Sequence, residues 1–383
     1  MKIDGFLLPS DKYHMPLNQG YYSIQDDFRK KGRLKFFQFV AEGKLTYETI
    51  SCFCGNDRFE VLATMDRQSI PQVISLCVLC GLMLNNPRLT ESSYNFLYSS
   101  GLYRDMYSGE NAFKFKTTAK STRFSNTISN FLSQKDKDLS VTPESIGFGY
   151  SNAILDFLSQ NDKDYSKRKK VLEVGCNAGY TLMGFKKAGF DVGGIEPDAR
   201  GCEVGNTFDL NIQCGKIEDF KGQNQYDLVV MTEVFEHIYN PAEALKSIKT
   251  FLKPNGVLYI SVIGLLCPAW RDLRKFTLVP HPYNFSLQTL AMVIEANGFR
   301  LVAGNQNIQA LFMPTNDSPG KYIACQENYT AIREKFRILE AKNKNFLYRY
   351  KEKFKAGVRE FLKLCGMFEM VIQLRKKIRQ PKK

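Results

Sequence analysis

From residue 170 to about residue 326, short runs rich in β-branched residues alternate with stretches that repeat apolar positions every three or four residues. The short runs predict strands, and the longer stretches predict amphipathic helices. Strands that alternate with helices of roughly 10 to 15 residues favour βαβ crossovers, so we expect an α/β domain with a doubly wound, mainly parallel sheet. The predicted strands are Val171–Val174, Val192–Ile195, Leu228–Met231, Val257–Ile263, Leu301–Val302 and Tyr322–Ala324, and helices are expected to begin near Ala178, Ala199, Pro241 and Ser286.

Composition divides the rest of the chain into shorter parts. Residues 46–100 hold four of the ten cysteines in two tight pairs, and residues 101–165 are polar with one apolar helical patch. After about residue 327, apolar residues recur at spacings of three, four or eight among many Lys and Arg, which predicts a basic amphipathic helix. The sequence therefore predicts five parts: an N-terminal segment (1–45), a cysteine-rich module (46–100), a helical bridge (101–165), the α/β domain (166–326) and a basic helical tail (327–383).

The positive charge of the chain is concentrated towards its C-terminal end. The 383 residues carry a net charge of +14, but residues 321–383 alone hold 18 Lys and Arg against 6 Asp and Glu, so the first 320 residues are near neutral at +2. An enzyme that acts on nucleic acid usually spreads positive potential over its substrate face, so this distribution disfavours a nucleic-acid partner. The tail could instead lie on an anionic membrane surface, pair as a coiled coil or fold back on the body.

Signals for export and for membrane insertion are missing from the sequence. The N-terminal residues form no apolar signal segment, and no run reaches the roughly 18 apolar residues that a membrane span needs. Ten cysteines without a secretion signal indicate a reducing compartment, in which close cysteine pairs hold metal more often than disulfides. We expect a cytoplasmic protein, with peripheral contact at the inner face of the membrane through the basic helix as one option. The sequence does not predict an oligomeric state.

A glycine-containing turn follows the first predicted strand of the α/β domain. Gly175, Asn177 and Gly179 stand at spacings of two, directly before a helix. Such a turn aims backbone N–H groups into the crevice at the carboxyl ends of the strands, where a nucleotide-like ligand can lie. The dinucleotide pattern G-x-G-x-x-G fails here, because Asn177 and Tyr180 stand where it requires glycine. Asn tolerates positive φ, so Asn177 can replace a glycine in the turn.

Glu196 ends the next predicted strand, 21 residues after Gly175. A carboxylate at that position can accept hydrogen bonds from both ribose hydroxyls of an adenosine. The turn and this carboxylate together predict a cofactor site that suits S-adenosylmethionine better than a dinucleotide.

The ordered set of motifs resembles the class I S-adenosylmethionine-dependent methyltransferases over about residues 148–326. It continues through Gly215–Asp219, Tyr226–Ile238, Pro241–Leu245 and Leu252–Leu258. The resemblance implies a seven-stranded Rossmann-like sheet with S-adenosylmethionine as cofactor. It places Glu173, Gly175 and Gly179 at the methionine end, Glu196 at the ribose, and Ile217 and Glu218 at the adenine. It also places Thr232 and Glu233 on the cofactor face near the acceptor. Asn177 and Pro197 are also predicted to bind the cofactor, because they belong to the turns after the first two strands.

The two cysteine pairs are Cys52-x-Cys54 and Cys77-x-x-Cys80, and Gly81 follows the second pair. Four thiolates without a histidine suit a closed, tetrahedral, structural Zn²⁺ site, so we expect a small zinc-ribbon-like module. Four reduced thiols without metal, or disulfides, are the alternative, which the short spacing of the first pair keeps open.

The text around the second pair resembles the zinc-binding region in front of bacterial methyltransferases that act on sugars, including enzymes of surface-polysaccharide clusters. The segments that carry this resemblance are Leu76–Leu82, Asn86–Arg88 and Phe96–Arg104. It implies a sugar hydroxyl or amine, on a nucleotide-sugar or glycan, as the methyl acceptor. C-methylating members carry a large C-terminal α/β domain, whereas 57 residues follow Gln326 here, which leaves O- or N-methylation.

Methyl transfer to a hydroxyl needs an aligned acceptor and a base. His281 lies between a predicted strand and a predicted helix, in a segment that resembles the H-x-x-x-F-(S/T) loop of related enzymes, with Ser286 as the helix N-cap. We hypothesise that His281 contacts or deprotonates the acceptor; the alternative is a loop histidine packed beside two prolines. For Glu236 and His237 we favour a capping role over a catalytic one. Two rival functions are a catalytically silent methyltransferase-like binding protein and an RNA or protein methyltransferase.

Overall fold

The computed structural model describes residues 2–4, 27–68, 70–108, 143–269, 276–315, 322 and 324–344. Contacts divide the chain into two compact units, Met1–Arg333 and Glu334–Lys383, and the architecture below is that of the first. Helix α9 (Gln326–Lys344) covers the beginning of the predicted tail, whereas residues 345–383 and most of the predicted bridge lie outside the described residues. The five-part division of the chain stays a prediction.

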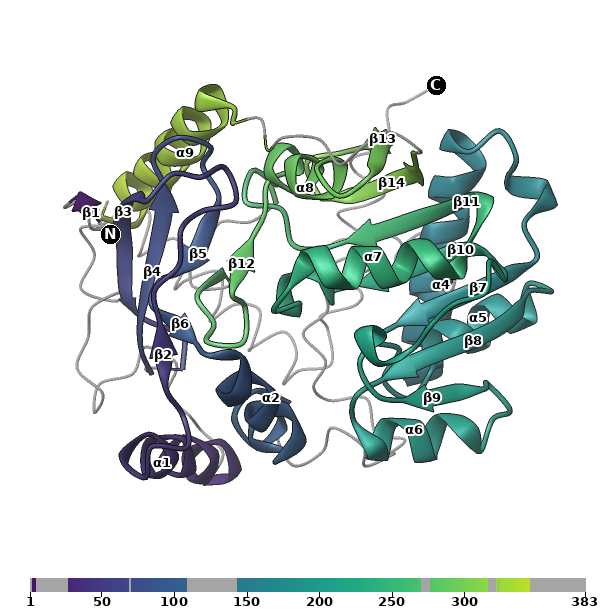
Figure 1. Ribbon diagram of the computed structural model, residues 1–383, viewed down its shortest axis with the longest axis horizontal. Coiled ribbons are helices and arrows are strands. Elements are labelled where there is room, and N and C mark those ends of the chain that lie inside the picture. The colour runs from purple at the N-terminus through teal and green to yellow at the C-terminus, as the bar shows by residue number, and fades with distance from the viewer. Residues whose placement is uncertain are drawn as a thin grey trace, which may run out of the picture. The chain divides into compact units, whose positions relative to one another are not determined.

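A seven-stranded sheet forms the α/β part of the first unit (Figure 1). Its strand order is β13-β14-β11-β10-β7-β8-β9. Every neighbouring pair from β11 to β9 is parallel, and β14 runs antiparallel to both β11 and β13. The sheet is therefore mixed and mainly parallel, as predicted. Its strands are β7 (Lys170–Val174), β8 (Asp191–Glu196), β9 (Ile212–Cys214), β10 (Tyr226–Thr232), β11 (Leu252–Ser261), β13 (Phe299–Gly304) and β14 (Gln309–Pro314).

One predicted strand is wrong, and two strands of this seven-stranded sheet, β9 and β14, were not predicted. Tyr322 and Ala324 lie outside any strand, and the antiparallel position next to β11 is filled by β14 instead. Only a short turn separates β14 from β13, so it forms a hairpin that does not follow the strand–helix alternation used to find the others. β9 has three residues and one buried side chain, which is too little for a periodic signal.

Helices cover both faces of the sheet because successive strand residues point to opposite sides. Leu172 packs in one apolar core with Leu245 of α7, while Val171 packs in a second core with Leu158 of α4 and Phe185 of α5. The predicted helix starts agree with the structure to within two residues. The helices are α4 (Pro143–Asn161), α5 (Tyr180–Lys187), α6 (Ala199–Asn206), α7 (Pro241–Phe251) and α8 (Leu287–Glu295).

A second sheet in the same unit has the order β1-β3-β4-β5-β12. Its last strand comes from the segment that contains His281, because Tyr283 pairs with Leu84 and Asn284 with Met83. The sheet is thus larger than the zinc-ribbon-like module expected from residues 46–100, and it includes a strand of the predicted α/β domain. Its strands are β1 (Lys2–Asp4), β3 (Arg58–Met65), β4 (Pro71–Cys77), β5 (Met83–Asn85) and β12 (Tyr283–Asn284).

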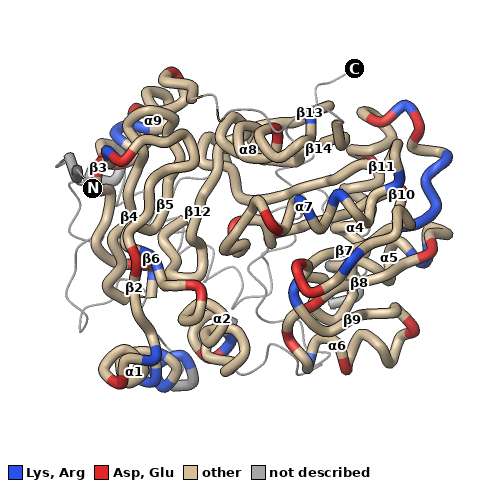
Figure 2. Tube along the Cα trace, in the orientation of Figure 1, with Lys and Arg blue, Asp and Glu red and all other residues tan. Residues whose placement is uncertain are grey.

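Smaller elements complete the N-terminal region. A two-stranded ribbon pairs β2 with β6, and two α-helices and the π-helix η3 lie in the same part of the chain. Among the described residues, no helix combines the length and the apolar character needed to cross a membrane. Figure 2 shows Lys and Arg gathered on α1 and mixed with Asp and Glu over the elements of the seven-stranded sheet. The bounds are α1 (Asp27–Ala41), β2 (Tyr47–Glu48), β6 (Arg88–Leu89), α2 (Glu91–Ser99) and η3 (Arg104–Ser108).

Candidate functional site

The turn after β7 adopts the left-handed backbone that the sequence predicts. The φ angles are +70° at Gly175, +53° at Asn177 and +72° at Gly179. A Cβ atom at Gly175 would lie 2.5 Å from Val234, and one at Gly179 would lie 2.4 Å from Leu210. Both glycines are therefore required by backbone conformation and by space. Gly175 is half-buried and Asn177 is exposed, so a ligand can reach this part of the turn at the carboxyl end of β7.

Glu196 links this turn to the end of β8. Its Oε2 accepts a hydrogen bond from the Asn177 backbone N–H at 2.8 Å, and its Oε1 accepts one from the Asp198 backbone N–H at 2.9 Å. Burial raises the pKa of Glu196, while the Asn177 N–H and the Arg104 guanidinium oppose that shift. Each carboxylate oxygen has two lone pairs, so each retains one for a hydroxyl of a bound ligand. Pro197 follows on the surface.

Two further polar atoms at this edge of the sheet have no hydrogen-bond partner among the described residues. They are Oε2 of Glu173 in β7 and Oγ1 of Thr232, which ends the neighbouring strand β10. Burial raises the pKa of Glu173 to about 8, although Thr181 donates a hydrogen bond to it. Glu233 follows Thr232 with a φ of +54° and an exposed side chain. The edge therefore offers buried polar atoms to a ligand between β7 and β10.

The residues predicted to contact adenine follow β9. The 3-10 turn η5 (Ile217–Asp219) places Ile217 in the apolar core and Glu218 at the surface. The Gly215 N–H donates to the Glu196 carbonyl at 3.0 Å, so this turn is fastened to the end of β8. Ile217 thus lies one short turn away from the carboxylate that is proposed to bind ribose.

The N-terminal region contacts these turns through residues that the sequence analysis did not select. Arg104 of η3 forms an ion pair with Asp198, whose other oxygen caps α6. Lys216, next to Ile217, donates to Asn95 of α2 at 3.1 Å. Arg104 was noticed only within a longer motif, because a single basic residue in a polar segment gives no periodic signal. The cofactor end of the site is therefore formed by the turns of the seven-stranded sheet together with α2 and η3 of the N-terminal region.

His281 lies in a buried cluster with a second histidine. Its ring centroid is 4.3 Å from that of His237, and the ring planes are perpendicular at 89°. Burial lowers the pKa of His237 to about 4 and holds the pKa of His281 well below its ordinary value, so both rings are neutral near pH 7. The Asn284 side chain hydrogen-bonds His281, and Tyr98 of α2 lies 2.8 Å from Nδ1 of His237. These contacts fix both ring orientations.

Glu236 of the 3-10 turn η6 (Phe235–His237) lines a narrow crevice beside His281. Oε2 of Glu236 and Nδ2 of Asn284 are buried there without a hydrogen-bond partner among the described residues. Burial, followed by the charge of Glu233, raises the pKa of Glu236 to about 8. The crevice has no room for a water molecule in this structure, so a ligand hydroxyl reaches this acceptor atom and this donor atom only when the crevice widens. The other lining residues are Val262, Ile263, Phe276 and Phe285.

The predicted capping role of Glu236 and His237 leaves out two features: Glu236 faces this crevice together with His281, and the ring of His237 lies against that of His281. Ligand atoms of the three side chains lie within 4.8 Å of one another, so the group could also hold a metal ion. The spacing could not be foreseen, because 44 positions separate His237 from His281 in the chain.

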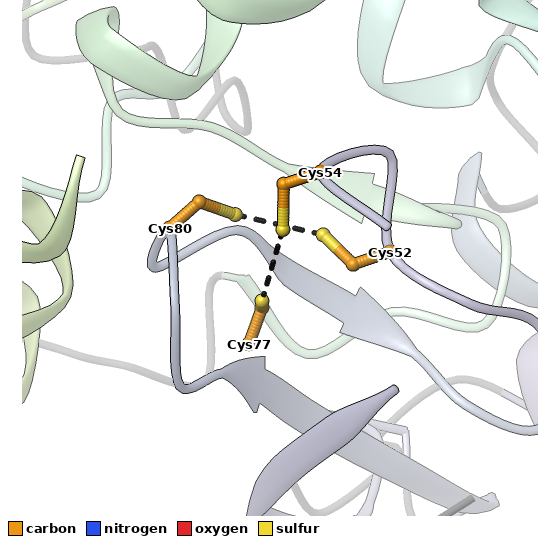
Figure 3. Close-up of side chains that lie close together, drawn as sticks. All are labelled: Cys52, Cys54, Cys77 and Cys80. Carbon is orange, nitrogen blue, oxygen red and sulfur yellow. Dashed lines mark hydrogen bonds between the residues drawn. The ribbon is translucent and has the colours of Figure 1, made fainter. Parts of the chain in front are cut away.

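The four predicted cysteine ligands converge (Figure 3). Their sulfur atoms all lie within 4.8 Å of one another, with 3.5 Å between Cys52 and Cys80 and 3.6 Å between Cys54 and Cys77. A tetrahedral zinc ion with Zn–S bonds of about 2.3 Å requires sulfur atoms about 3.8 Å apart. The geometry fits that requirement, and the short spacing of the first pair does not prevent it.

Backbone turns and N–H donors support the cysteine cluster. Gly55 and Gly81 both have positive φ, and the Gly81 N–H donates to the Cys77 carbonyl at 3.0 Å. Asn56 donates to the Cys77 sulfur at 3.3 Å, and the Leu82 N–H donates to the Cys80 sulfur at 3.4 Å. Such donors favour thiolate, the form that binds metal.

Two other cysteines differ from expectation. Cys202 of α6 and Cys214 of β9 form a disulfide, whereas the sequence analysis favoured reduced cysteines. Cys214 pairs with Glu196 across the two strands, so the bond joins α6 to β9 beside the carboxylate. The four clustered cysteines are free thiols, in agreement with a metal site and against the disulfide alternative.

Comparison with known proteins identifies the region that contains the glycine turn. Residues 149–303 match the family model described as "Methyltransferase domain". A ubiquinone biosynthesis O-methyltransferase of Actinobacillus pleuropneumoniae serotype 5b is 34% identical over 124 residues, which are 29% of this chain and 50% of that protein. The corresponding enzyme of Haemophilus ducreyi is 31% identical over 134 residues, which are 32% of this chain and 54% of that protein. The chain thus spans about half the length of these curated relatives.

Solved structures give a similar picture. A SAM-dependent methyltransferase from Archaeoglobus fulgidus superposes with a TM-score of 0.33 at 17% sequence identity, covering 39% of this chain and 69% of that one. Residues 149–303, which match the family model, contain the left-handed glycine turn and most strands of the seven-stranded sheet. The chain contains a class I S-adenosylmethionine-dependent methyltransferase domain.

Proposed function

We propose that the whole chain transfers a methyl group from S-adenosylmethionine to a hydroxyl of a small molecule. The observation that carries this proposal is the junction of the glycine turn with β8. There the buried carboxylate of Glu196 accepts the Asn177 N–H at 2.8 Å and retains lone pairs for a ribose. A turn without a ligand does not need a buried carboxylate, which costs free energy to desolvate. The family match over residues 149–303 supports the same cofactor.

At the cofactor end, each selected residue has a role that its position supports. When bound, S-adenosylmethionine supplies an electrophilic methyl group on a sulfonium sulfur. Glu196 accepts hydrogen bonds from the ribose hydroxyls, and Ile217 gives the adenine an apolar wall. The bare backbone at Gly175 allows close approach of the methionine portion. Glu173 and Thr232, each with an unpartnered polar atom, bind its polar groups.

At the acceptor end, His281 is the proposed base. Its ring is neutral near pH 7, so a nitrogen lone pair is free to take a proton from the acceptor hydroxyl. His281 would take the proton of the acceptor hydroxyl, while bound S-adenosylmethionine would supply the methyl group and leave as S-adenosylhomocysteine. Asn284 hydrogen-bonds the ring and Glu236 lines the same crevice, so both orient the reacting groups. The products are a methyl ether and S-adenosylhomocysteine.

Two kinds of observation bear on the acceptor class. The named relatives are O-methyltransferases of ubiquinone biosynthesis, which supports oxygen as the methylated atom and a small molecule as the acceptor. The resemblance of the cysteine-rich region supports a sugar hydroxyl, and that finer assignment stays a prediction. A cytoplasmic location and membrane contact through the basic tail also stay predictions from the sequence.

We also propose that Cys52, Cys54, Cys77 and Cys80 hold a structural zinc ion. Four sulfur ligands leave no open coordination position, so the ion would stabilise the surrounding turns rather than activate a substrate. Sulfur separations of 3.5 Å and 3.6 Å in two of the pairs support this proposal.

Calorimetric titration with S-adenosylhomocysteine tests the proposed function. The zinc-loaded wild type should bind one equivalent. Glu196→Ala removes two backbone contacts and the ribose acceptor, and should weaken binding by about 100-fold, since a lost charged hydrogen bond costs roughly 1.5–3 kcal/mol. Glu203→Ala removes the same charge from an exposed position of α6 and should bind like the wild type. A wild type that does not bind would remove the proposal, and equal loss in both variants would remove the role of Glu196.

A further inference from the structure

We propose that the cysteine cluster positions the acceptor loop, defined as residues 276–286, and that Asn328 is a positioning residue between them. The inference rests on the proposed function, because it concerns the loop that carries His281. Three separate connections join the cluster to the loop, and each can be followed from atom to atom.

The first connection is the shared sheet. The chain passes from Cys80 through Gly81 and Leu82 directly into β5, whose partner is β12 of the acceptor loop. The Cys77 N–H donates to the Leu82 carbonyl at 2.9 Å, so the cysteine turn fixes Leu82, the residue directly before β5. A shift of the turn would therefore move the strand on which β12 rests.

Asn85, the last residue of β5, fastens the loop on the other side of His281. Its N–H donates to the Pro282 carbonyl at 3.1 Å. Its side-chain Nδ2 donates to the carbonyls of Leu278 at 2.9 Å and Val279 at 3.1 Å. The backbone on both sides of His281 is thus held by one residue that lies five positions after Cys80.

The second connection is Asn328, which is 4% exposed at the beginning of α9. Its Nδ2 donates to the Cys80 carbonyl at 2.6 Å, and its Oδ1 accepts from the Ser286 hydroxyl at 2.7 Å. Ser286 is the N-cap of α8 and ends the acceptor loop. A Cβ atom at Gly81 would lie 2.8 Å from Asn328 Nδ2, so the glycine after the second cysteine pair makes room for this bridge.

The third connection is apolar. Phe53 lies between the first two cysteines, and its ring centroid is 4.7 Å from that of Tyr283 in β12. Because close-packed interiors transmit displacement, this contact couples the cluster to the loop independently of the hydrogen bonds.

A metal ion that holds all four sulfurs would fix the turn around Cys80 at one position. Without the ion, the four thiols lose that constraint, and the contacts of β5 and Asn328 rest on a mobile turn. The acceptor loop should then open more often, while the cofactor turn at residues 175–179, whose hydrogen bonds in the described part of the chain do not involve the four cysteines, keeps its stability.

Hydrogen–deuterium exchange on the full chain tests this coupling without knowledge of the acceptor. Exchange is compared for peptides covering 50–82, 170–200 and 276–290, before and after zinc is removed with a chelator, and zinc content is measured alongside. Asn328→Ala and the matched control Thr330→Ala are examined with zinc bound. Thr330 is exposed on the same helix, and its side chain bonds only within that helix.

Zinc removal should raise exchange about tenfold in 276–290, which corresponds to about 1.4 kcal/mol of opening free energy and is the size expected for one lost buried hydrogen bond, and it should leave 170–200 unchanged. Asn328→Ala should retain zinc and raise exchange in 276–290, whereas Thr330→Ala should not. A rise confined to 50–82 after zinc removal would overturn the proposal. If zinc removal raises exchange in every peptide, the zinc-loaded variants test the proposal instead. Equal exchange of peptide 276–290 in Asn328→Ala and in the wild type would then overturn the proposal. The titration with S-adenosylhomocysteine is separate, so failure of the proposed function is recognised independently.

Discussion

Replacing Glu236 by glutamine should change how the free energy of unfolding depends on pH. The side chain is 4% exposed, and its Oε2 has no hydrogen-bond partner among the described residues. Burial raises the pKa of this carboxyl from 4.5 to about 8, so the folded protein keeps a proton that the unfolded chain releases. Between these two values the folded state binds more protons, and the free energy of unfolding therefore falls as pH rises.

The magnitude follows from the size of the shift. One carboxyl of this kind contributes a slope of up to ~1.4 kcal/mol per pH unit, which amounts to ~3–4 kcal/mol between pH 5 and pH 8. Glutamine has nearly the same shape and stays neutral, so the Glu236→Gln variant should gain that amount relative to the wild type as pH rises. Glu173, whose pKa is also raised to about 8, contributes to both proteins and cancels in the difference.

Urea denaturation at pH 5, 6, 7 and 8, followed by circular dichroism, measures this difference. His237 and His281 act in the opposite direction at low pH, because their lowered pKa values make stability fall as pH decreases, but they are present in both proteins. Glu203→Gln is the control, since Glu203 is exposed. A difference between wild type and Glu236→Gln that stays constant over the whole pH range would refute the reasoning.

Two further substitutions test the cofactor end. Gly179→Ala should lower stability and weaken S-adenosylhomocysteine binding, because its φ is +72° and the added Cβ would lie 2.4 Å from Leu210. The control Gly189→Ala, with a φ of +87° and open space around it, should lose only the backbone cost of roughly 1–2 kcal/mol. Equal losses of stability in the two variants would contradict the steric argument. Arg104→Gln breaks the ion pair with Asp198 and should weaken the same binding about fivefold, since such pairs are worth up to about 1 kcal/mol; an unchanged titration would show that the N-terminal region does not support the ribose site.

The cofactor end could be predicted because its signals are local. The left-handed Asn177, the glycines on either side of it and the helix start at Ala199 depend on residues that are neighbours in the chain. Glu196 followed from one strand and its end. Its contact with the Asn177 N–H was not foreseen, but it joins two elements that were already placed correctly.

The parts that could not be predicted depend on contacts between distant residues. β12 has two residues and becomes a strand only because β5, about 200 positions earlier in the chain, pairs with it. Arg104 reaches the site from a segment that gives no periodic signal, and Asn328 is a polar residue at the start of the predicted tail helix that the apolar periodicity does not single out. The pairing of Glu236 with the histidines likewise depends on how the acceptor loop returns to β10, which no pattern in the sequence specifies.

This difference decides how far similarity to known enzymes can be extended. The matched family model covers residues 149–303, which include the glycine turn, Glu196 and His281. Three residues that support the acceptor end lie outside that range. Asn85 and Asn328 fasten the acceptor loop, and Tyr98 contacts His237. Cofactor binding can therefore be carried over from relatives with more reason than the acceptor can, because function resides in sites rather than in folds. A shared glycine turn supports methyl transfer, whereas the loop that is proposed to contact the acceptor is held in place by β5 of the N-terminal sheet and by Asn328 at the start of α9.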